Sequence, residues 1–373
     1  MVQYILLAGF IVSVFVSLIM VQKKKSTSEV LLLLLVSSTS YLLFSYLLVY
    51  NGNYLKYPSL TALGLGFPLL TGPLIYLYIK YQTKPIGFQR IDLLHFIPFI
   101  LCNFLFIDFY FMPFEDRVEA MKNNLVNYQT VGFLKTALLY LSGVIYITWT
   151  FLLLYAHRKR LKNEFSNPEK INFNWFLFLN IGLLLVWIVV IFFQEDRIIL
   201  SASSVHIICI CFFGLKQGNV FNHKEILYTQ QQPIFINNDK SDIPFEMRDT
   251  NYNDSNLEQV YFKIIDLIKK EKLFINPELK IMDLAIHLDI HPNLASKAIN
   301  HVSEANFYDL VNKMRVEEFI NNAKSADANK YTIIAMAFDA GFNSKATFNR
   351  NFKKITGISP SEFLNQSKID TQK

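Results

Sequence analysis

Amide and basic side chains gather near the C-terminal end of the sequence, in residues 337–363. Among them are Lys345, Asn349 and Arg350, and no acidic residue occurs within 340–361. Arginine and asparagine can each form two hydrogen bonds with a base edge in the major groove of DNA, and lysine can neutralise a phosphate. This stretch therefore predicts chemistry that suits nucleic acid.

A helix-turn-helix is the element that would present these side chains to a groove. Gly341 provides the turn, and the helix after it carries Phe348 and Phe352 on the face that must be buried. Ser344 is in position to cap this helix, because a serine oxygen can accept a hydrogen bond from the free amides of the first turn. A last short helix is expected after the turn at 357–360.

The same pattern occurs once more, earlier in the chain. Residues 281–288 form its supporting helix, and its second helix begins near Pro292, where proline suits the first helical position. An amphipathic helix of about 256–272 comes before it, and a long helix of about 307–324 joins the two copies. We therefore expect an all-helical domain at residues 256–373.

These spacings resemble the signature of AraC/XylS-type transcription regulators. The resemblance covers about residues 257–366 and implies a seven-helix domain, in which two helix-turn-helix units flank a connecting helix and enter successive major grooves. In the first unit it is carried by Asp283, Leu284, Ala285, Ser296, Asn306, Phe307 and Arg315. In the second it is carried by Ala337, Gly341, Phe342, Ser344, Phe348, Arg350, Phe352, Lys353, Lys354, Gly357, Ser359, Pro360 and Phe363.

The resemblance also implies which side chains contact DNA. The implied base contacts are Asn293, Ser296, Lys297, Lys345, Asn349 and Arg350, and the implied phosphate contacts are Asn300, Lys353 and Lys354. Two positions depart from the family pattern. Ala295 stands where a leucine is usual and Glu304 where a turn glycine is common, so we expect looser packing or contacts in the first unit.

The first part of the chain is too apolar for a soluble domain. Hydrophobic residues make up 52 % of the sequence and charged residues 18 %. Seven apolar segments, each about as long as the 20 residues needed to cross a bilayer, lie at about 2–21, 30–50, 60–81, 91–111, 132–155, 173–193 and 198–215. Residues 1–215 are therefore interpreted as a seven-helix transmembrane sensor module.

The loops between these segments predict the orientation in the membrane. The odd-numbered loops hold 11 lysine and arginine residues and the even-numbered loops hold 4. Because basic loops stay in the cytoplasm, we expect the N-terminus outside and the C-terminal domain in the cytoplasm, with the protein in the bacterial inner membrane. Residues 216–255 have no apolar periodicity and predict a flexible cytoplasmic linker.

Few polar side chains in the apolar segments could do chemistry. His95 and His206 are candidates for sensing within the membrane, and the alternative is that they are hydrogen-bonded packing residues. The glycines and prolines of segment 60–81 predict either a hinge that lines a ligand or a kinked packing helix. Three cysteines, all in apolar runs, indicate packing and not a disulfide framework or a metal site.

Together these features predict an all-α, membrane-bound one-component transcription regulator that is not an enzyme. We find no nucleophile elbow, phosphate-binding glycine loop or metal cluster in the sequence, and so no cofactor is expected. The expected partners are promoter DNA, the lipid bilayer, a small-molecule, lipid or protein signal, and a second copy of the chain. The alternative is a transporter or membrane enzyme with a regulatory appendage that binds DNA or protein.

Overall fold

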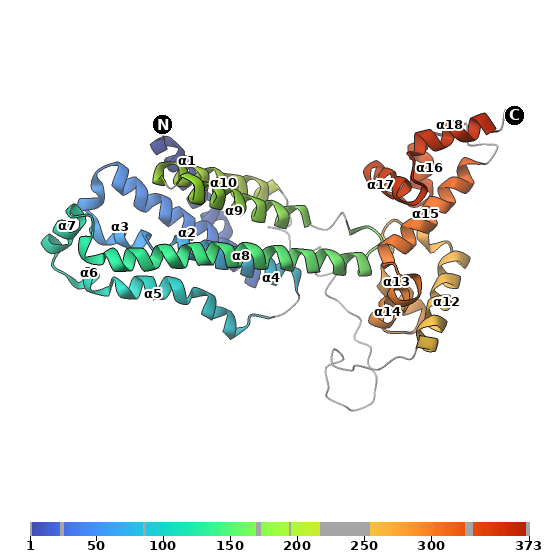
Figure 1. Ribbon diagram of the computed structural model, residues 1–373, viewed down its shortest axis with the longest axis horizontal. Helices are drawn as coiled ribbons and strands as arrows, with labels where there is room; N and C mark the ends of the chain where they lie inside the picture. The colour runs from blue at the N-terminus through green and yellow to red at the C-terminus, as the bar shows by residue number, and fades with distance from the viewer. Residues whose placement is uncertain are drawn as a thin grey trace, which may run out of the picture. The chain divides into compact units, whose positions relative to one another are not determined.

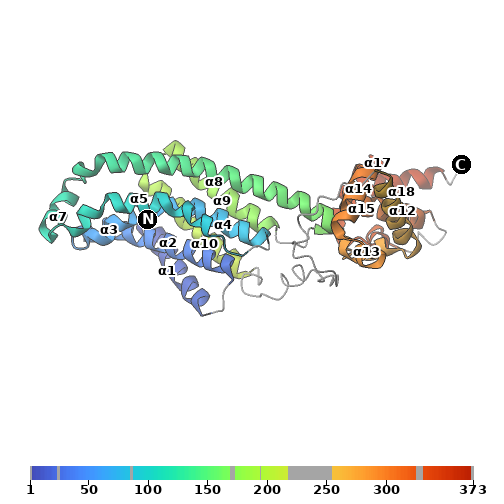
Figure 2. The same ribbon diagram turned by 90° about the horizontal axis from the view of Figure 1, so that it is seen from below.

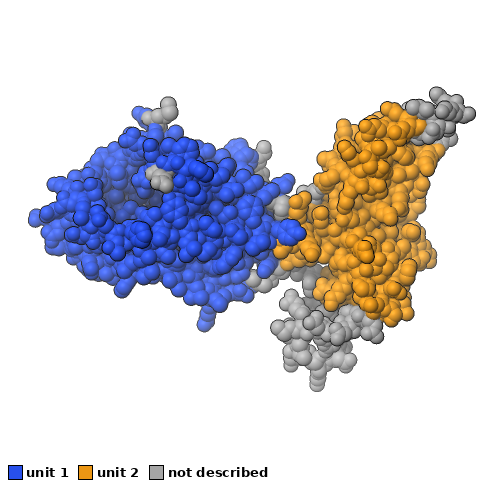
Figure 3. Space-filling view, in the orientation of Figure 1, with its two compact units in different colours: residues 1–155, 173–237 blue, residues 156–172, 238–373 orange. Residues whose placement is uncertain are grey.

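The chain forms two compact helical units. A computed structural model describes residues 2–22, 26–84, 87–168, 173–193, 195–216, 254–324 and 331–370, and within these ranges the only β-type pairing is an isolated bridge. Unit 1 comprises residues 1–155 and 173–237, and unit 2 comprises residues 156–172 and 238–373 (Figure 3). The expected linker at 216–255 lies almost entirely outside the described residues.

Unit 1 is a bundle of long helices with shorter helices between them (Figure 1). Its helices are α1 (Val2–Val21), α2 (Thr27–Tyr50), η1 (Asn53–Leu55), α3 (Pro58–Gly64), α4 (Pro68–Thr83), η2 (Arg90–Phe96), α5 (Ile97–Leu105), α6 (Ile107–Phe111), α7 (Phe114–Lys122), η3 (Val126–Tyr128), α8 (Gln129–Glu164), α9 (Phe173–Phe193) and α10 (Asp196–Lys216). The last turns of α8 belong to unit 2.

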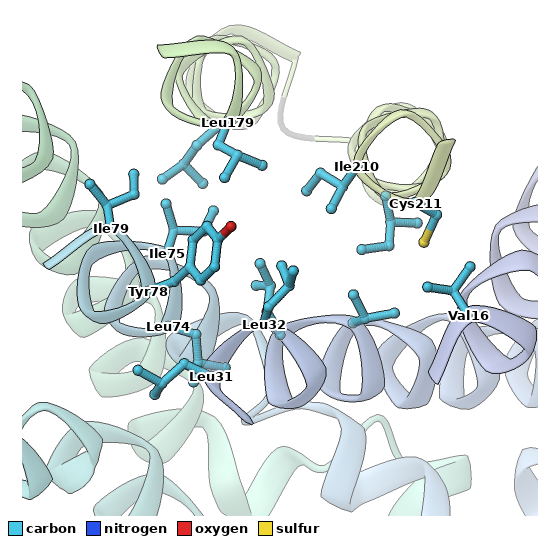
Figure 4. Packing of buried hydrophobic residues seen from close by; sticks show 14 of the residues in the cluster. Val16, Leu31, Leu32, Leu74, Ile75, Tyr78, Ile79, Leu179, Ile210 and Cys211 are labelled. Carbon is cyan, nitrogen blue, oxygen red and sulfur yellow. The ribbon is translucent and has the colours of Figure 1, made fainter. Parts of the chain in front are cut away.

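The core of unit 1 lies where α1, α2, α4, α9 and α10 meet (Figure 4). Helix α1 buries a stripe at helical spacing, formed by Leu6, Gly9, Ser13, Val16 and Met20. In α4 the ring of Tyr78 is buried, and its hydroxyl accepts a hydrogen bond from Trp175 Nε1 of α9 at 3.1 Å. The buried indole and phenol thus satisfy each other, as polar atoms in an apolar core must.

The outward faces of α1, α8 and α9 expose large apolar side chains. Ile11 of α1 is 56 % exposed, Phe133 of α8 is 78 % exposed and Phe192 of α9 is 76 % exposed. Apolar surface on this scale marks contact with a membrane or a partner. Among the residues that the structure describes, five helices are long and apolar enough to span a bilayer, and this suggests membrane association.

The expected count of seven spans is supported only in part. The segment 60–81 is a bent pair, α3 and α4, with 46° between them, so it gives at most a sixth span. The segment 91–111 was expected to be one helix but is divided among η2, α5 and α6, each too short to span a bilayer alone. Pro98, in the first turn of α5, has no amide hydrogen and cannot continue a helix from the preceding residues.

This broken segment nevertheless runs along the bundle. Figures 1 and 2 show the chain passing through α5 and α6 to α7 at one end of unit 1 and returning in α8. The broken stretch packs on the bend of the preceding pair, where a Cβ on Gly66 would lie 2.6 Å from Asn103 Nδ2. The segment 91–111 is thus not one continuous helix, and it is not among the candidate spans of the described residues.

Unit 2 is an all-helical domain with two cores that share one helix. Its elements are the end of α8, α12 (Asp254–Lys270), η6 (Leu273–Ile275), α13 (Ile281–Leu288), α14 (Pro292–Ser303), α15 (Phe307–Ala323), α16 (Ile333–Asp339), α17 (Lys345–Thr356) and α18 (Pro360–Asp370). Helix α15 supplies Phe307, Val311 and Met314 to the first core and Val316 and Phe319 to the second. It is therefore buried on several sides and connects the two cores.

The two helix-turn-helix units have the expected boundaries. Helices α13 and α14 form the first unit, and Asp289 between them has a φ of 50°. Helices α16 and α17 form the second, with Gly341 in the turn at a φ of 97°. Phe348 and Phe352 are fully buried, as predicted. Glu304, which replaces a usual glycine, adopts a left-handed φ of 51° at the end of α14.

Replacing Gly341 with alanine is expected to lower the free energy of unfolding of unit 2 by about 2–4 kcal/mol, from left-handed strain and overpacking. Its Cβ would lie 2.5 Å from the carbonyl oxygen of Phe274 and 2.8 Å from that of Ile275. Gly357 is the matched control, because it also has a positive φ but nothing lies near its Cβ position. The loss of stability in Gly341→Ala and Gly357→Ala is measured by urea titration of the purified protein in nanodiscs, with amide exchange in α17 as the readout. Equal losses in the two variants would contradict the steric argument.

Replacing Glu304 with glycine is expected to stabilise unit 2 by about 0.5–1 kcal/mol, because glycine removes left-handed strain at some cost in chain entropy. The same urea titration measures this gain in stability. Replacing Glu304 with alanine retains the Cβ and should give no gain, so a gain in both variants would show that backbone strain is not the cause.

Candidate nucleic-acid interface

Helix α14 presents the expected contact residues of the first unit on one side. His291 caps the helix, since its Nδ1 accepts a hydrogen bond from the amide of Asn293 at 3.1 Å. The helix buries Ala295, Ala298 and Ile299. The opposite side carries Asn293, Lys297 and Asn300, which are exposed, and Ser296, which is half-buried.

The amide and hydroxyl side chains of this face approach each other. Asn300 Nδ2 lies 3.5 Å from Ser296 Oγ, at the outer limit of a hydrogen bond. Ala295 is fully buried where the family pattern has leucine, so the first unit has a smaller side chain at this core position. His291 as the cap was not foreseen from the sequence, because Ser, Thr, Asp and Asn are the usual caps.

Helix α17 has the same two-sided arrangement. Ser344 caps it, and its Oγ accepts a hydrogen bond from the amide of Thr347 at 3.4 Å, as the sequence predicted. The helix buries Thr347, Phe348, Asn351 and Phe352. Its exposed residues include all the expected contacts of the second unit, which are Lys345, Asn349, Arg350, Lys353 and Lys354.

Arg350 is held by a neighbour that sequence reasoning missed. Its Nη2 donates a hydrogen bond to the hydroxyl of Tyr308 on α15 at 2.9 Å. The same hydroxyl accepts a hydrogen bond from Asn351 Nδ2 at 2.7 Å. Tyr308 is buried, so its position is fixed by the packing of α15. This contact orients the guanidinium on the exposed face of α17 before any ligand binds.

Lys354 has an ion-pair partner on the same helix α15. Its Nζ lies 2.8 Å from Asp309 Oδ1, and the other carboxylate oxygen of Asp309 accepts a hydrogen bond from Asn306 Nδ2 at 3.0 Å. Lys353, the preceding residue of α17, is exposed. Exposed ion pairs contribute only about 0–1 kcal/mol, so Lys354 can exchange Asp309 for a phosphate at little cost.

A buried arginine lies between the two helix-turn-helix units. Arg315 of α15 is 2 % exposed, and its Nε donates a hydrogen bond to the carbonyl oxygen of Phe274 at 2.7 Å. Burial lowers the pKa of Arg315 to about 10, although the nearby Tyr308 raises it. The guanidinium therefore remains protonated at neutral pH. The resemblance included Arg315, but only the fold reveals its position between the cores.

The two histidines expected in the membrane lie in different surroundings. His95 Nδ1 is 2.8 Å from the hydroxyl of Tyr146, and its Nε2 is 3.8 Å from Asp92 Oδ1. Asp92 is itself buried and paired with Lys80 at 2.7 Å. His95 is thus part of a hydrogen-bonded polar cluster, which fits the packing alternative as well as sensing.

His206 lines a cavity of about 390 Å³ within unit 1. This volume is in the range of small-molecule sites. Apolar side chains of α2, α4, α8, α9 and α10 form most of the wall, and Lys135 and Asp196 add charges. The structure therefore does not bring His95 and His206 into one site. Within the described part of the chain, no group of three or more His, Cys, Asp or Glu side chains could hold a metal ion.

Comparison with known proteins identifies the C-terminal region. Residues 284–366 match the family model of a helix-turn-helix domain, of the AraC type. A search of curated proteins and a search of solved structures each found no match to this chain. The matched range begins within α13 and extends into α18, so it contains both helix-turn-helix units and their connecting helix. Residues 284–366 are thus similar to a helix-turn-helix domain, which supports a role in DNA binding.

Proposed function

We propose that this protein is a membrane-bound one-component transcription regulator and not an enzyme. The observation that carries the proposal is the exposed amide and basic surface on α14 and α17, the second helices of two helix-turn-helix units. Side chains of these types on such helices can contact base edges in the major groove. The described part of the same chain contains five helices long and apolar enough to span a bilayer.

The cytoplasmic position of unit 2 is also part of the proposal. It is supported by the excess of basic residues in the odd-numbered loops. It requires that α5 and α6 together act as one broken crossing, since an uncrossed segment would reverse the side of everything that follows. The broken stretch extends to the end of unit 1 from which α8 returns, which is compatible with such a crossing (Figure 1).

The proposed input is a small molecule, a lipid or a partner protein that acts on unit 1. The cavity that His206 lines supports a small ligand with a mainly apolar body. The bend between α3 and α4 is adjacent, because Pro68, Thr71 and Gly72 at the start of α4 also line the cavity. A ligand there would contact the helix that bends, and so could change the bend. The proposed output is binding of promoter DNA, by a monomer or by a pair of copies.

Replacing Arg350 with alanine is expected to weaken binding to the selected DNA by about 1–3 kcal/mol and to relax discrimination at one base pair. Replacing Lys353 with alanine should weaken binding to all sequences alike and reduce the salt slope by about 1. The full chain in nanodiscs is first used to select fragments from a genomic library, and affinities are then measured at several salt concentrations. Absence of any sequence preference in the wild type would sink the proposal.

The orientation can be tested at Asn123, which follows α7, and at Lys159, near the C-terminal end of α8. Cysteine in place of Asn123 should react with a membrane-impermeant thiol reagent added to whole cells, whereas cysteine in place of Lys159 should react only after lysis. Both side chains are exposed, so folding should not hide them. The native cysteines are buried or half-buried, and a parent protein without them provides the background. Reversal of the two results would refute the proposed topology.

A transporter with a regulatory appendage is separated from the regulator by a flux measurement. The cavity in unit 1 is the feature that a transporter would share. Vesicles that contain the protein truncated after residue 216 would accumulate a substrate if unit 1 transports. The regulator proposal expects no substrate-dependent flux in these vesicles.

A further inference from the structure

The residues that follow α8 lie inside the DNA-binding unit. Ser166 is 1 % exposed, and its amide donates a hydrogen bond to the carbonyl oxygen of Leu279 at 3.1 Å. Phe165 pairs with Lys280 in an isolated antiparallel bridge, and the ammonium of Lys280 lies 5.9 Å from the centre of the Phe165 ring. These residues precede unit 2's other helices by almost 90 positions, yet they pack as part of it.

Ser166 completes the hydrogen bonding of Arg315. A guanidinium has five N–H donors. Two of them bond to Ser166, one to its carbonyl oxygen at 3.3 Å and one to its Oγ at 3.1 Å. The other three bond to the carbonyl oxygens of Phe274 and Asn276 and to Asn312 Oδ1. Every donor of this buried cation is therefore satisfied only while Ser166 is in place, and a buried charge with unused donors is unfavourable.

Arg315 occupies the junction between the two helix-turn-helix units. The preceding residue Met314 belongs to the first core and the following residue Val316 to the second. The guanidinium bonds to the carbonyl oxygen of Phe274 in η6 and lies 6.0 Å from the centre of the Phe342 ring in the second turn. Arg315 therefore contacts η6, whose Phe274 is part of the first core, and the turn of the second unit, and Ser166 completes its hydrogen bonding.

A second contact connects α8, through Tyr308, to α17 of the second unit. The ammonium of Lys162 lies 5.6 Å from the centre of the Tyr308 ring. The hydroxyl of Tyr308 holds Arg350 and Asn351 of α17. Thus both ends of the segment 162–166 touch residues that position α17 or its turn.

We propose that residues 162–166 form a coupling segment through which α8 controls DNA binding, an inference that rests on the proposed function. When docked, the segment fixes Arg315 and so holds the two helix-turn-helix units at the separation that two successive major grooves require. When a change in unit 1 moves α8 and withdraws Ser166, the junction loosens. The two helix-turn-helix units then bind DNA as independent modules. Binding of one unit no longer gives the other a high effective concentration at its own half-site.

Replacing Ser166 with leucine tests the coupling in the full chain in nanodiscs, because leucine removes the Oγ acceptor and does not fit the buried position. Affinity for DNA with both half-sites should fall by about tenfold or more, as expected when a second module loses effective concentration. Affinity for DNA with only the half-site of α17 should stay unchanged. Lys159, which is exposed one to two turns earlier in α8, gives the control variant Lys159→Leu, which should alter neither affinity.

Hydrogen exchange of the amides of Ile275 and Asn276 gives a second readout that does not depend on DNA. These amides bond within the turn that Arg315 fixes, to the carbonyl oxygens of Lys272 and Leu273. Their protection should fall in Ser166→Leu while that of Phe348 and Phe352 is retained. The milder variant Ser166→Ala removes only Oγ, and it should show a smaller shift in the same direction if the leucine variant fails to fold.

The outcomes separate the two proposals. If the wild type binds specific DNA and Ser166→Leu weakens both half-site and full-site binding equally, the segment is only a structural brace and the coupling proposal is overturned. If Ser166→Leu changes neither affinity nor exchange, it is also overturned, and the regulator proposal stands. If the wild type selects no DNA, the regulator proposal fails, and DNA binding cannot be the output of the segment.

Discussion

The hydrogen bonding of Arg315 is the constraint on which the arrangement of unit 2 depends. A cation buried in the middle of α15 can persist only if all its donors are satisfied, and its acceptors come from η6, from α15 itself and from the residues after α8. No carboxylate contacts it within the residues that the structure describes. The charge is therefore balanced by oriented carbonyl groups of separate segments, and each of those segments must be in place for the others to be stable.

The hydrogen bonds of Arg315 explain why the residues at the end of α8 belong to unit 2 and not to unit 1. Helix α8 begins among the apolar helices of unit 1, and its last turns, together with Phe165 and Ser166 after it, are part of unit 2. A continuous helix can transmit a displacement of one end to the other.

Helices α14 and α17 each have a buried face that holds them in the fold and an exposed face that can meet a ligand. Each buries a stripe of small or aromatic residues and leaves donors on the opposite side, and the donors of α17 are oriented by Tyr308 and Asp309 of α15. The first unit differs in detail, with alanine at a core position and a non-glycine residue in a left-handed conformation. Both differences were visible in the sequence, but their effect on backbone and packing was not.

The sequence by itself determined the local elements, because helical periodicity, caps and turn residues act over a few positions. It predicted α13 to α18, the Ser344 cap, the buried Phe348 and Phe352, the exposed contact residues and the apolar segments. It failed where the outcome depends on residues far apart in the chain. Tertiary packing decides the break in 91–111 and the cavity that His206 lines. It also decides the hydrogen bond from Arg350 to Tyr308 and those from Arg315 to Ser166. In the last case the partners are separated by 149 positions, and no local pattern can encode such a contact.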